Sequence, residues 1–281
     1  MIALTTVQQL IKEQGLRWEA GETGLSNLYP DLVETGFFGV TDDQNDEEHI
    51  SDSILNSDIE DIEESDRVPK INWKEINERS VTTIKDQKNC GACVSFAVCA
   101  VAESMLQIQH DISYDLSEAE LFFCGAGKNA KGWSLPKALK YAQNKGIGLE
   151  KDHAYDTNKK DCLKIDPVVK VGAYIPIKEN SRLLSNVISY HGPVAATMRV
   201  FEDFRFYKGG IYRPVTNNYL GKHAIAIIGF DDHDSCWIVK NSWSTNWGDN
   251  GFARIAYGTC GIGDEFACYA LDVELVEKPI V

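Results

Sequence analysis

The sequence predicts an α+β protein of two lobes. Segments with the periodicity of helices come first, and segments with the pattern of strands follow them in the second half of the chain. A length of 281 residues is enough for one large domain or two compact lobes. The hydrophobic and charged fractions, 43% and 25%, are ordinary for a globular protein, so the chain can fill a core.

Residues 1–41 are expected to dock on another part of the protein. Leu4, Val7 and Leu10 recur at helical spacing, and Gly15 is placed to end that helix. The residues that follow supply more apolar surface than a loose tail would carry. They are Trp18, Leu25, Leu28, Tyr29, Leu32, Phe37 and Phe38.

The acidity of the chain is concentrated in one segment. The formal net charge is -14, and twelve of the 42 acidic residues lie between residues 42 and 66, where there is no Lys or Arg. The rest of the chain is nearly neutral and does not resemble a nucleic-acid-binding protein. We interpret residues 42–67 as an acidic linker, and the alternative is a short helix. Its apolar face would hold Ile54, Leu55, Ile59 and Ile62.

Residues 68–281 are expected to form the compact part of the protein. A helix rich in Ala, Val and Leu spans residues 93–110. A capping box at residues 117–120 opens a second helix, and a third spans residues 134–145 until Gly146 ends it. Four strands then follow. They span residues 193–198, 223–230, 236–240 and 251–256.

The N-terminus lacks the basic region and long apolar run of a secretory signal. No window approaches eighteen consecutive apolar residues, so no membrane span is expected. We therefore expect a cytoplasmic protein, or one exported by a non-classical route, without a membrane or nucleic-acid partner.

Cys93 is the candidate nucleophile of a catalytic site. It stands at the start of a predicted helix, and a helix N-terminus or a neighbouring imidazolium lowers the pKa of a thiol. His223 begins an apolar strand that would hold its ring, and Asn241 can accept a hydrogen bond from the second ring nitrogen. Gln87 lies six residues before the cysteine. Its side-chain amide, with the backbone N–H of the cysteine, would stabilise an oxyanion.

The pair Cys90 and Cys93 also suggests two other chemistries, a redox pair and half of a zinc site. No second Cys-x-x-Cys and no His at zinc-finger spacing accompany it. We therefore expect neither a metal nor any other cofactor.

Several separate motifs occur in one order along the chain. They are the run from Gln87 to Cys93, Leu116-Ser117-Glu118, Gly132-Trp133, His223 at the head of a strand, the run from Trp237 to Phe252 around Asn241, and Val68-Pro69 with Trp73. Together they resemble the papain-like cysteine peptidases over roughly residues 68–281. The resemblance implies a helical lobe at about 75–175 packed on a β-barrel-like lobe at about 176–281, with the active site in the cleft between them.

The resemblance also implies roles for single residues. Cys93 would be the nucleophile and His223 the general base and acid. Asn241 would orient the imidazole, Gln87 would line the oxyanion hole, and Trp243 would cover the hydrogen bond between the asparagine and the histidine.

Three further residues would bind substrate. Gly132, with Trp133 beside it, would offer its backbone to an extended peptide. Glu265 matches a position at the floor of the pocket for the second residue before the cleaved bond, where a carboxylate would accept Arg or Lys. The alternative is a surface glutamate, or one neutralised by Lys222.

The resemblance implies one disulfide, between Cys124 and Cys162. Cys90 and Cys260 match bridged positions whose partners are missing from this chain, which favours reducing surroundings.

The sequence therefore predicts a monomeric cysteine endopeptidase that cleaves proteins or peptides through an acyl-enzyme. No insertion resembles the loop that makes some family members exopeptidases. The N-terminal segment is expected to restrain the enzyme as an intramolecular inhibitor. Two alternatives remain open, which are acyl transfer to another acceptor (transpeptidase or isopeptidase) and a catalytically idle binding module on the same fold.

Overall fold

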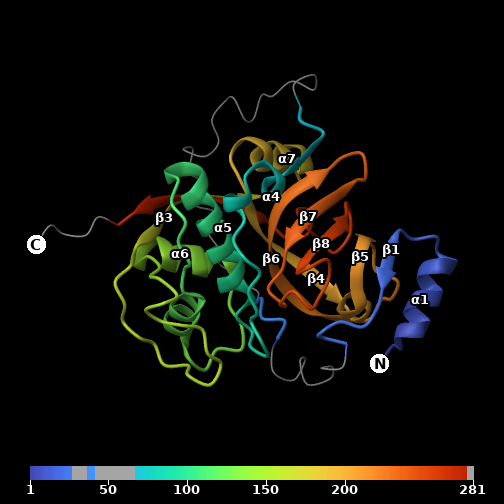
Figure 1. The fold of residues 1–281 in the computed structure, drawn as a ribbon, viewed down its shortest axis with the longest axis horizontal. Coiled ribbons are helices and arrows are strands. Elements are labelled where there is room, and N and C mark those ends of the chain that lie inside the picture. Colours follow the sequence, from blue (N-terminus) through green and yellow to red (C-terminus); the bar gives the residue numbers. More distant parts are fainter. Residues whose placement is uncertain (27–36, 42–66, 277–281) are drawn as a thin grey trace, which may run out of the picture.

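The computed structural model describes residues 1–26, 37–41 and 67–276. Helices gather around α5 on one side, and a β lobe lies on the other (Figure 1). This arrangement confirms the predicted α+β fold of two lobes. The predicted acidic linker and its alternative helix lie outside the described residues, apart from Arg67.

The first and third predicted helices are confirmed. Helix α5 (Cys93–His110) ends at Asp111, which adopts a left-handed conformation with φ of 54° and donates its N–H to the last turn. Helix α6 (Leu135–Lys145) ends at Gly146, whose φ of 81° suits a residue without a side chain.

The second predicted helix is present, but most of it is a π-helix and not an α-helix. Ser117 Oγ accepts a hydrogen bond from the N–H of Glu120 at 2.9 Å, as the capping box predicts. The carboxylate of Glu120 accepts from the hydroxyl of Tyr141 at 3.4 Å instead of returning to Ser117. The turns that follow are wound as a π-helix, η3 (Glu120–Gly127).

The strands of the described residues form one nine-stranded sheet with the order β1-β5-β8-β7-β6-β4-β9-β3, and β2 pairs with β6. The four predicted strands are present as β4, β6, β7 and β8. The strand bounds are β1 Trp18–Ala20, β2 Lys70–Asn72, β3 Val169–Ile177, β4 Val194–Phe201, β5 Tyr207–Tyr212, β6 Tyr219–Asp231, β7 Cys236–Lys240, β8 Phe252–Ala256 and β9 Cys268–Leu275.

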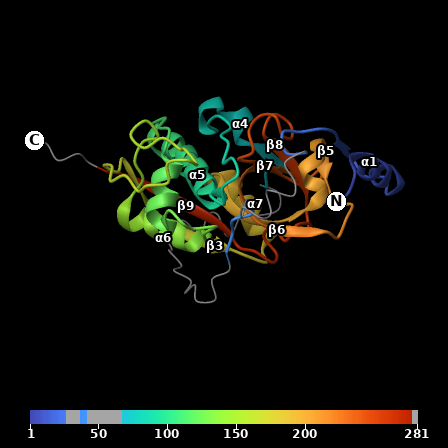
Figure 2. The ribbon, with the colours of Figure 1, turned by 90° about the horizontal axis from the view of Figure 1, so that it is seen from below.

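Shorter helices flank this sheet. Helix α1 (Leu4–Glu13) lies at the end of the molecule opposite the helical lobe (Figures 1 and 2). The remaining helical elements are α4 Trp73–Ile76, η2 Glu78–Ser80, α7 Ser181–Tyr190 and η4 Glu202–Phe206.

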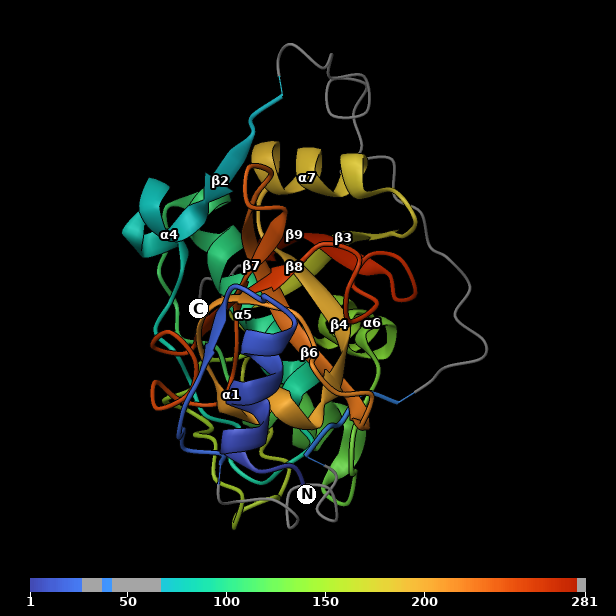
Figure 3. The same cartoon turned by 90° about the vertical axis from the view of Figure 1, so that its right-hand side faces the viewer.

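Two apolar cores hold the fold together. One lies around α5 and joins the helical lobe to the back of the sheet. The other fills the β lobe and includes Val7, Ile11 and Trp18 of the N-terminal segment. Residues 1–26 thus pack on the β lobe, with α1 lying on its outer side (Figure 3).

The structure contains the disulfide Cys124–Cys162. The other six cysteines, Cys90 and Cys260 among them, are free and buried. No described helix is long and apolar enough to cross a membrane. Within residues 1–26, 37–41 and 67–276, no group of three or more His, Cys, Asp or Glu side chains could hold a metal ion.

Candidate active site

Cys93 is the first residue of α5, and its side chain is fully buried. The helix N-terminus favours a thiolate. Burial outweighs this effect and raises the pKa of the thiol to about 11, although hydrogen bonds from backbone groups of Ala224, Gly39 and Val94 oppose the rise. The thiol is therefore uncharged at neutral pH in this structure.

His223 lies on β6, and Asn241 directly follows the adjacent strand β7. Nε2 of His223 lies 2.8 Å from Oδ1 of Asn241, which also accepts from the N–H of Ser242 at 2.8 Å. Burial lowers the pKa of His223 to about 4, although the bond to the asparagine raises it. The asparagine therefore fixes the orientation of a neutral imidazole.

Trp243 covers this pair. Its ring lies 4.6 Å from the ring of His223, centroid to centroid, at an angle of 33°. Only 3% of the tryptophan is exposed. The indole therefore keeps water from the imidazole face, in the place that the sequence predicts for it.

Gln87 is fully buried, and its amide makes three hydrogen bonds. Nε2 donates to the carbonyl of Cys90 at 2.8 Å and to that of Phe37 at 3.1 Å. Oε1 accepts from the hydroxyl of Ser242 at 2.7 Å, and the backbone N–H of Gln87 donates to the Ser242 carbonyl at 2.9 Å. The serine, which the sequence analysis did not single out, thus holds the amide so that its N–H₂ faces Phe37.

Residues 37–41, which we call the cleft segment, pair with the helical lobe. The N–H of Trp133 donates to the carbonyl of Gly39 at 2.7 Å, and the N–H of Thr41 donates to the carbonyl of Trp133 at 2.8 Å. Val40 and Trp133 form a parallel bridge. These bonds come from Trp133, one residue after the expected Gly132. A Cβ at Gly132 would lie 2.2 Å from the Gly39 carbonyl oxygen, so Gly132 permits the close approach.

The cleft segment also contacts the β lobe and the loop before Cys93. The N–H of Val40 donates to the carbonyl of Lys222 at 3.4 Å. The rings of Phe37 and Trp243 lie 5.5 Å apart. A Cβ at Gly39 would lie only 2.0 Å from the carbonyl oxygen of Gly91. The segment therefore lies against both lobes and against the loop that precedes the nucleophile.

Glu265 is half-exposed, and its carboxylate lies 2.7 Å from a guanidinium nitrogen of Arg199 on β4. Lys222, the partner weighed from the sequence, instead lies over the ring of Phe266, with its ammonium 5.1 Å from the ring centroid. The charge of Glu265 is therefore neutralised by Arg199.

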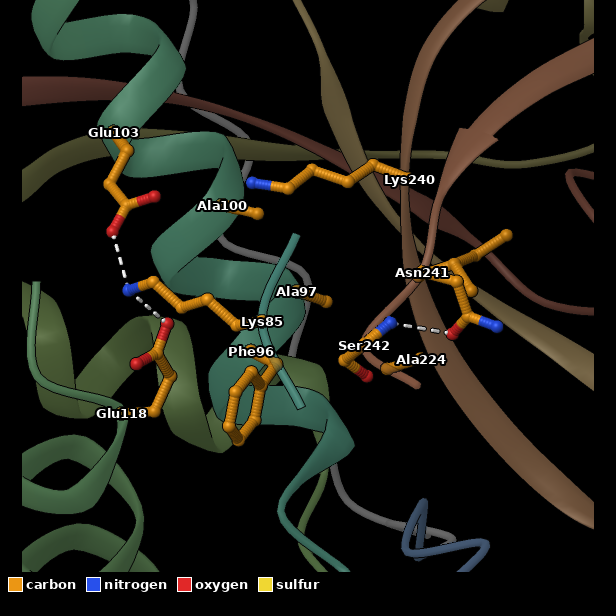
Figure 4. Close-up of a pocket in the computed structure, with 11 residues that line it drawn as sticks. Lys85, Phe96, Ala97, Ala100, Glu103, Glu118, Ala224, Lys240, Asn241 and Ser242 are labelled. Carbon is orange, nitrogen blue, oxygen red and sulfur yellow. Dashed lines mark hydrogen bonds and ion pairs between the residues drawn. The ribbon is translucent and has the colours of Figure 1, made fainter. Parts of the chain in front are cut away.

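A cluster of charged side chains lies next to Asn241, in the interior between α5 and the end of β7 (Figure 4). Lys85 Nζ lies 2.9 Å from Glu103 Oε1 and 2.8 Å from Glu118 Oε1. From the β lobe, Lys240 Nζ donates to Thr82 Oγ1 at 2.7 Å, and Thr82 bonds in turn to Glu103. Lys240 directly precedes Asn241, so this network links the end of β7 that carries Asn241 to the helical lobe.

Comparisons with known proteins identify the family. The family model described as "Papain family cysteine protease" matches residues 68–270. A viral cathepsin of Epiphyas postvittana nucleopolyhedrovirus is 32% identical over 213 residues, which is 72% of this chain and 64% of the relative. A cathepsin L-like proteinase of Fasciola hepatica is 33% identical over 205 residues, which is 69% of this chain and 62% of the relative. The chain thus spans less than two thirds of the length of these relatives.

Solved structures show the same fold. The digestive procathepsin L2 of the Tenebrio molitor larval midgut has a TM-score of 0.80 at 22% identity, covering 96% of this chain and 89% of that one. The bromelain protease of Ananas comosus has a TM-score of 0.66 at 28% identity, covering 74% of this chain and all of that one.

Proposed function

Because this chain belongs to the papain family of cysteine proteases, we propose that it is a cysteine endopeptidase that hydrolyses peptide bonds in proteins or peptides. The observation that carries the proposal is the buried hydrogen bond of 2.8 Å between His223 and Asn241, covered by Trp243. Beside it, Cys93 stands at the N-terminus of α5.

The reaction begins with attack of the Cys93 thiolate on the carbonyl carbon of the substrate. The backbone N–H of Cys93 and the amide of Gln87 stabilise the oxyanion that forms. His223 gives its proton to the leaving amine, and an acyl-enzyme remains. The imidazole then takes a proton from water, which attacks the thioester and releases the acid. Asn241 keeps the ring oriented through both steps.

The cleft segment holds the enzyme in a latent state. Gln87 Nε2, the proposed oxyanion donor, donates to the carbonyl of Phe37. A substrate carbonyl therefore has to displace the Phe37 carbonyl before it can accept this hydrogen bond. The backbone of Trp133, which would pair with an extended substrate, is bonded to Gly39 and Thr41. Substrate and the cleft segment therefore compete for the same hydrogen-bonding groups.

We divide the chain accordingly into a docking segment (1–41), an acidic linker (42–67) and a catalytic domain (68–281). Within the catalytic domain, the helical lobe covers about 75–175 and the β lobe about 176–281. The active unit is a monomer whose intramolecular inhibitor is its own N-terminal segment.

Cleavage of a peptide library tests the activity and its restraint together. The full chain is compared with a chain in which residues 37–41 are replaced by alternating Gly and Ser. We expect the second chain to cleave faster, and a thiol-directed inhibitor to abolish cleavage in both. Cleavage that persists after Cys93→Ala would disprove the assigned nucleophile, and equal rates for the two chains would disprove the restraint.

A further inference from the structure

We propose that residues 1–26, which we call the N-terminal module, remain part of the active enzyme, and that Trp18 is a positioning residue for the pair of His223 and Asn241. The proposal rests on the proposed function, because it concerns the same site. It separates the N-terminal segment into a permanent structural module and a removable cleft segment.

The module completes the sheet of the β lobe. Strand β1 pairs antiparallel with β5, and the N–H of Ile211 donates to the carbonyl of Arg17 at 2.8 Å. The N–H of Gly21 donates to the carbonyl of Phe206 at 2.9 Å. Loss of the module would turn β5 into an open edge and uncover the apolar surface that Val7 and Trp18 now bury.

One buried side chain of the β lobe holds both ends of the module. Arg205, which is 7% exposed, donates to the carbonyl of Ile2 at 2.9 Å and to that of Ser26 at 3.3 Å. Its neighbour Glu202, 2% exposed, accepts from the N–H of Ile2 at 2.7 Å. Arg205 and Glu202 also lie 3.7 Å from each other, so departure of the module would leave this buried ion pair with fewer hydrogen bonds, which is costly.

A continuous row of rings connects the module to the active site. Ring centroids are 5.1 Å apart between Trp18 and Tyr212, and 4.4 Å apart between Tyr212 and Phe204. The row continues from Phe204 to Trp243 at 5.6 Å and from Trp243 to His223 at 4.6 Å. Because such rings pack at close to crystal density, the position of the outermost ring constrains the innermost one.

Release of the cleft segment makes this row more important. In the latent chain, Trp243 is also supported by Phe37 at 5.5 Å and Phe38 at 6.3 Å. Once those rings leave, the support that remains comes from Phe204 at 5.6 Å and Trp247 at 4.9 Å, on the side of the module. The active enzyme therefore depends on the module more than the latent chain does.

The fate of the module is tested with the full chain carrying sites for two different sequence-specific proteases. One site lies between Ser26 and Phe37 and the other between Thr41 and Arg67. After both cuts, native size-exclusion chromatography and mass spectrometry should find the fragment with residues 1–26 bound to the catalytic chain in equal amount. Elution of that fragment away from a catalytic chain that stays fully active would overturn the proposal.

The role of Trp18 is tested in the Gly39→Ala background, in which the added methyl group collides with the Gly91 carbonyl and displaces the cleft segment. We expect Trp18→Ala to lower kcat at least about tenfold with a smaller change in KM, because the imidazole is less well held. The alkaline limb of the kcat/KM profile should move to higher pH, since burial is what lowers the pKa of His223. Trp18→Phe should restore both kcat and the position of the alkaline limb.

Trp237→Ala is the matched control. This tryptophan is equally buried at 3% exposure, but it packs on Phe230 and Tyr257, outside the row. It should lower the melting temperature and leave the pH profile in place. Equal effects of Trp18→Ala and Trp237→Ala on the profile would overturn the positioning role. Failure of every chain to cleave peptides would instead disprove the proposed function, and retention of the module would still be measurable.

Discussion

The two side chains of the proposed reaction, Cys93 and His223, are both buried and uncharged in this structure. Burial raises the pKa of Cys93 to about 11 and lowers that of His223 to about 4. Between these values both the thiol and the imidazole are neutral, although the proposed reaction needs a thiolate and an imidazolium. The proposed latency would therefore be electrostatic as well as steric, because return of water to the cleft is what would allow the ion pair to form.

Alkylation of Cys93 should report this difference. In the full chain the thiolate fraction rises about tenfold per pH unit up to the raised pKa, so iodoacetamide labelling should be slow at neutral pH and climb steeply with pH. With the cleft segment displaced by Gly39→Ala, labelling should be at least about tenfold faster at neutral pH and depend weakly on pH. Mass spectrometry locates the label, and Cys93→Ala is the control. Fast labelling of the latent chain at every pH would contradict this account.

The ion pair between Arg199 and Glu265 should set the preference for the second residue before the cleaved bond. Arg199→Ala frees the carboxylate, so the ratio of kcat/KM for Arg over Leu at this substrate position should rise by about tenfold. Lys222→Ala is the comparison, and it should change this ratio less. An unchanged ratio after Arg199→Ala would place Glu265 outside the pocket.

At this scale the sequence was enough to propose the site residues, but not the serine that holds one of them. Cys93, His223, Asn241 and Gln87 carry chemistry that local sequence reveals, such as a nucleophile at the start of a helix. Ser242, which holds the amide of Gln87, comes from a chain position 155 residues away. Such a contact depends on how two lobes pack, which no local pattern records.

Among the elements, the cleft segment is the one on which the proposed restraint depends. Its closest approach is at Gly39, where a Cβ would lie 2.0 Å from the carbonyl oxygen of Gly91. Only a residue without a side chain fits there. We expect Gly39→Ala to raise peptide hydrolysis by the full chain at least about tenfold, since overpacking costs about 1–3 kcal/mol.

Gly24→Ala is the matched control for that change. A Cβ at Gly24 would lie 3.4 Å from the Cβ of Asn246, which is ordinary contact, and the position belongs to the N-terminal module. It should leave hydrolysis as low as in the original chain. A Gly39→Ala chain that also stays latent would show that the segment tolerates a side chain at this point.

Elements with a strong period and clear ends were predicted within a residue or two, as α5, α6 and β7 show. The short strands β1 and β2 were not predicted, because three residues carry no period. The π-helix η3 was expected as an ordinary helix, since its apolar residues alone do not reveal how tightly the chain winds. The sequence of the cleft segment shows only Phe-Phe-Gly within an apolar stretch, which does not predict where that segment binds.

Across the whole molecule, the buried network of Lys85, Glu103 and Glu118 joins the lobes through Thr82 and Lys240. Burial lowers the pKa of Lys85, but the two carboxylates more than offset this, and the pKa is raised. Burial also raises the pKa of Glu118, from 4.5 to about 8. The cation of Lys85 opposes this rise, so its loss would raise the pKa of Glu118 further.

Lys85→Met should lower the free energy of unfolding by about 3–5 kcal/mol above pH 8, because it leaves the ionised Glu118 buried without its cation. The loss should shrink as the pH falls through about 8, since Glu118 then takes up a proton and no longer needs the cation. Urea denaturation at several pH values measures this. Lys88→Met removes an exposed ion pair with Asp86 and should cost less than about 1 kcal/mol at any pH. A pH-independent loss for Lys85→Met would contradict the electrostatic cause.

The two-lobed fold was predictable from the order of the patterns and from the family motifs. The order of the strands was not, because β1 pairs with β5 nearly two hundred residues later, and such long pairings leave no trace in local sequence. For the same reason the sequence did not reveal that residues 1–26 and 37–41 contact different parts of the protein.

The position of the cleft segment in the chain has a consequence for biosynthesis. A ribosome extends a chain at about 5–20 residues per second, from the N-terminus. Residues 37–41 are therefore made before Cys93, and Asn241 is made last of the triad. By the time the newborn protein can assemble its catalytic groups, the residues that cover them already exist. Under the proposed function, the segment that restrains the enzyme is therefore always made before the nucleophile that it restrains.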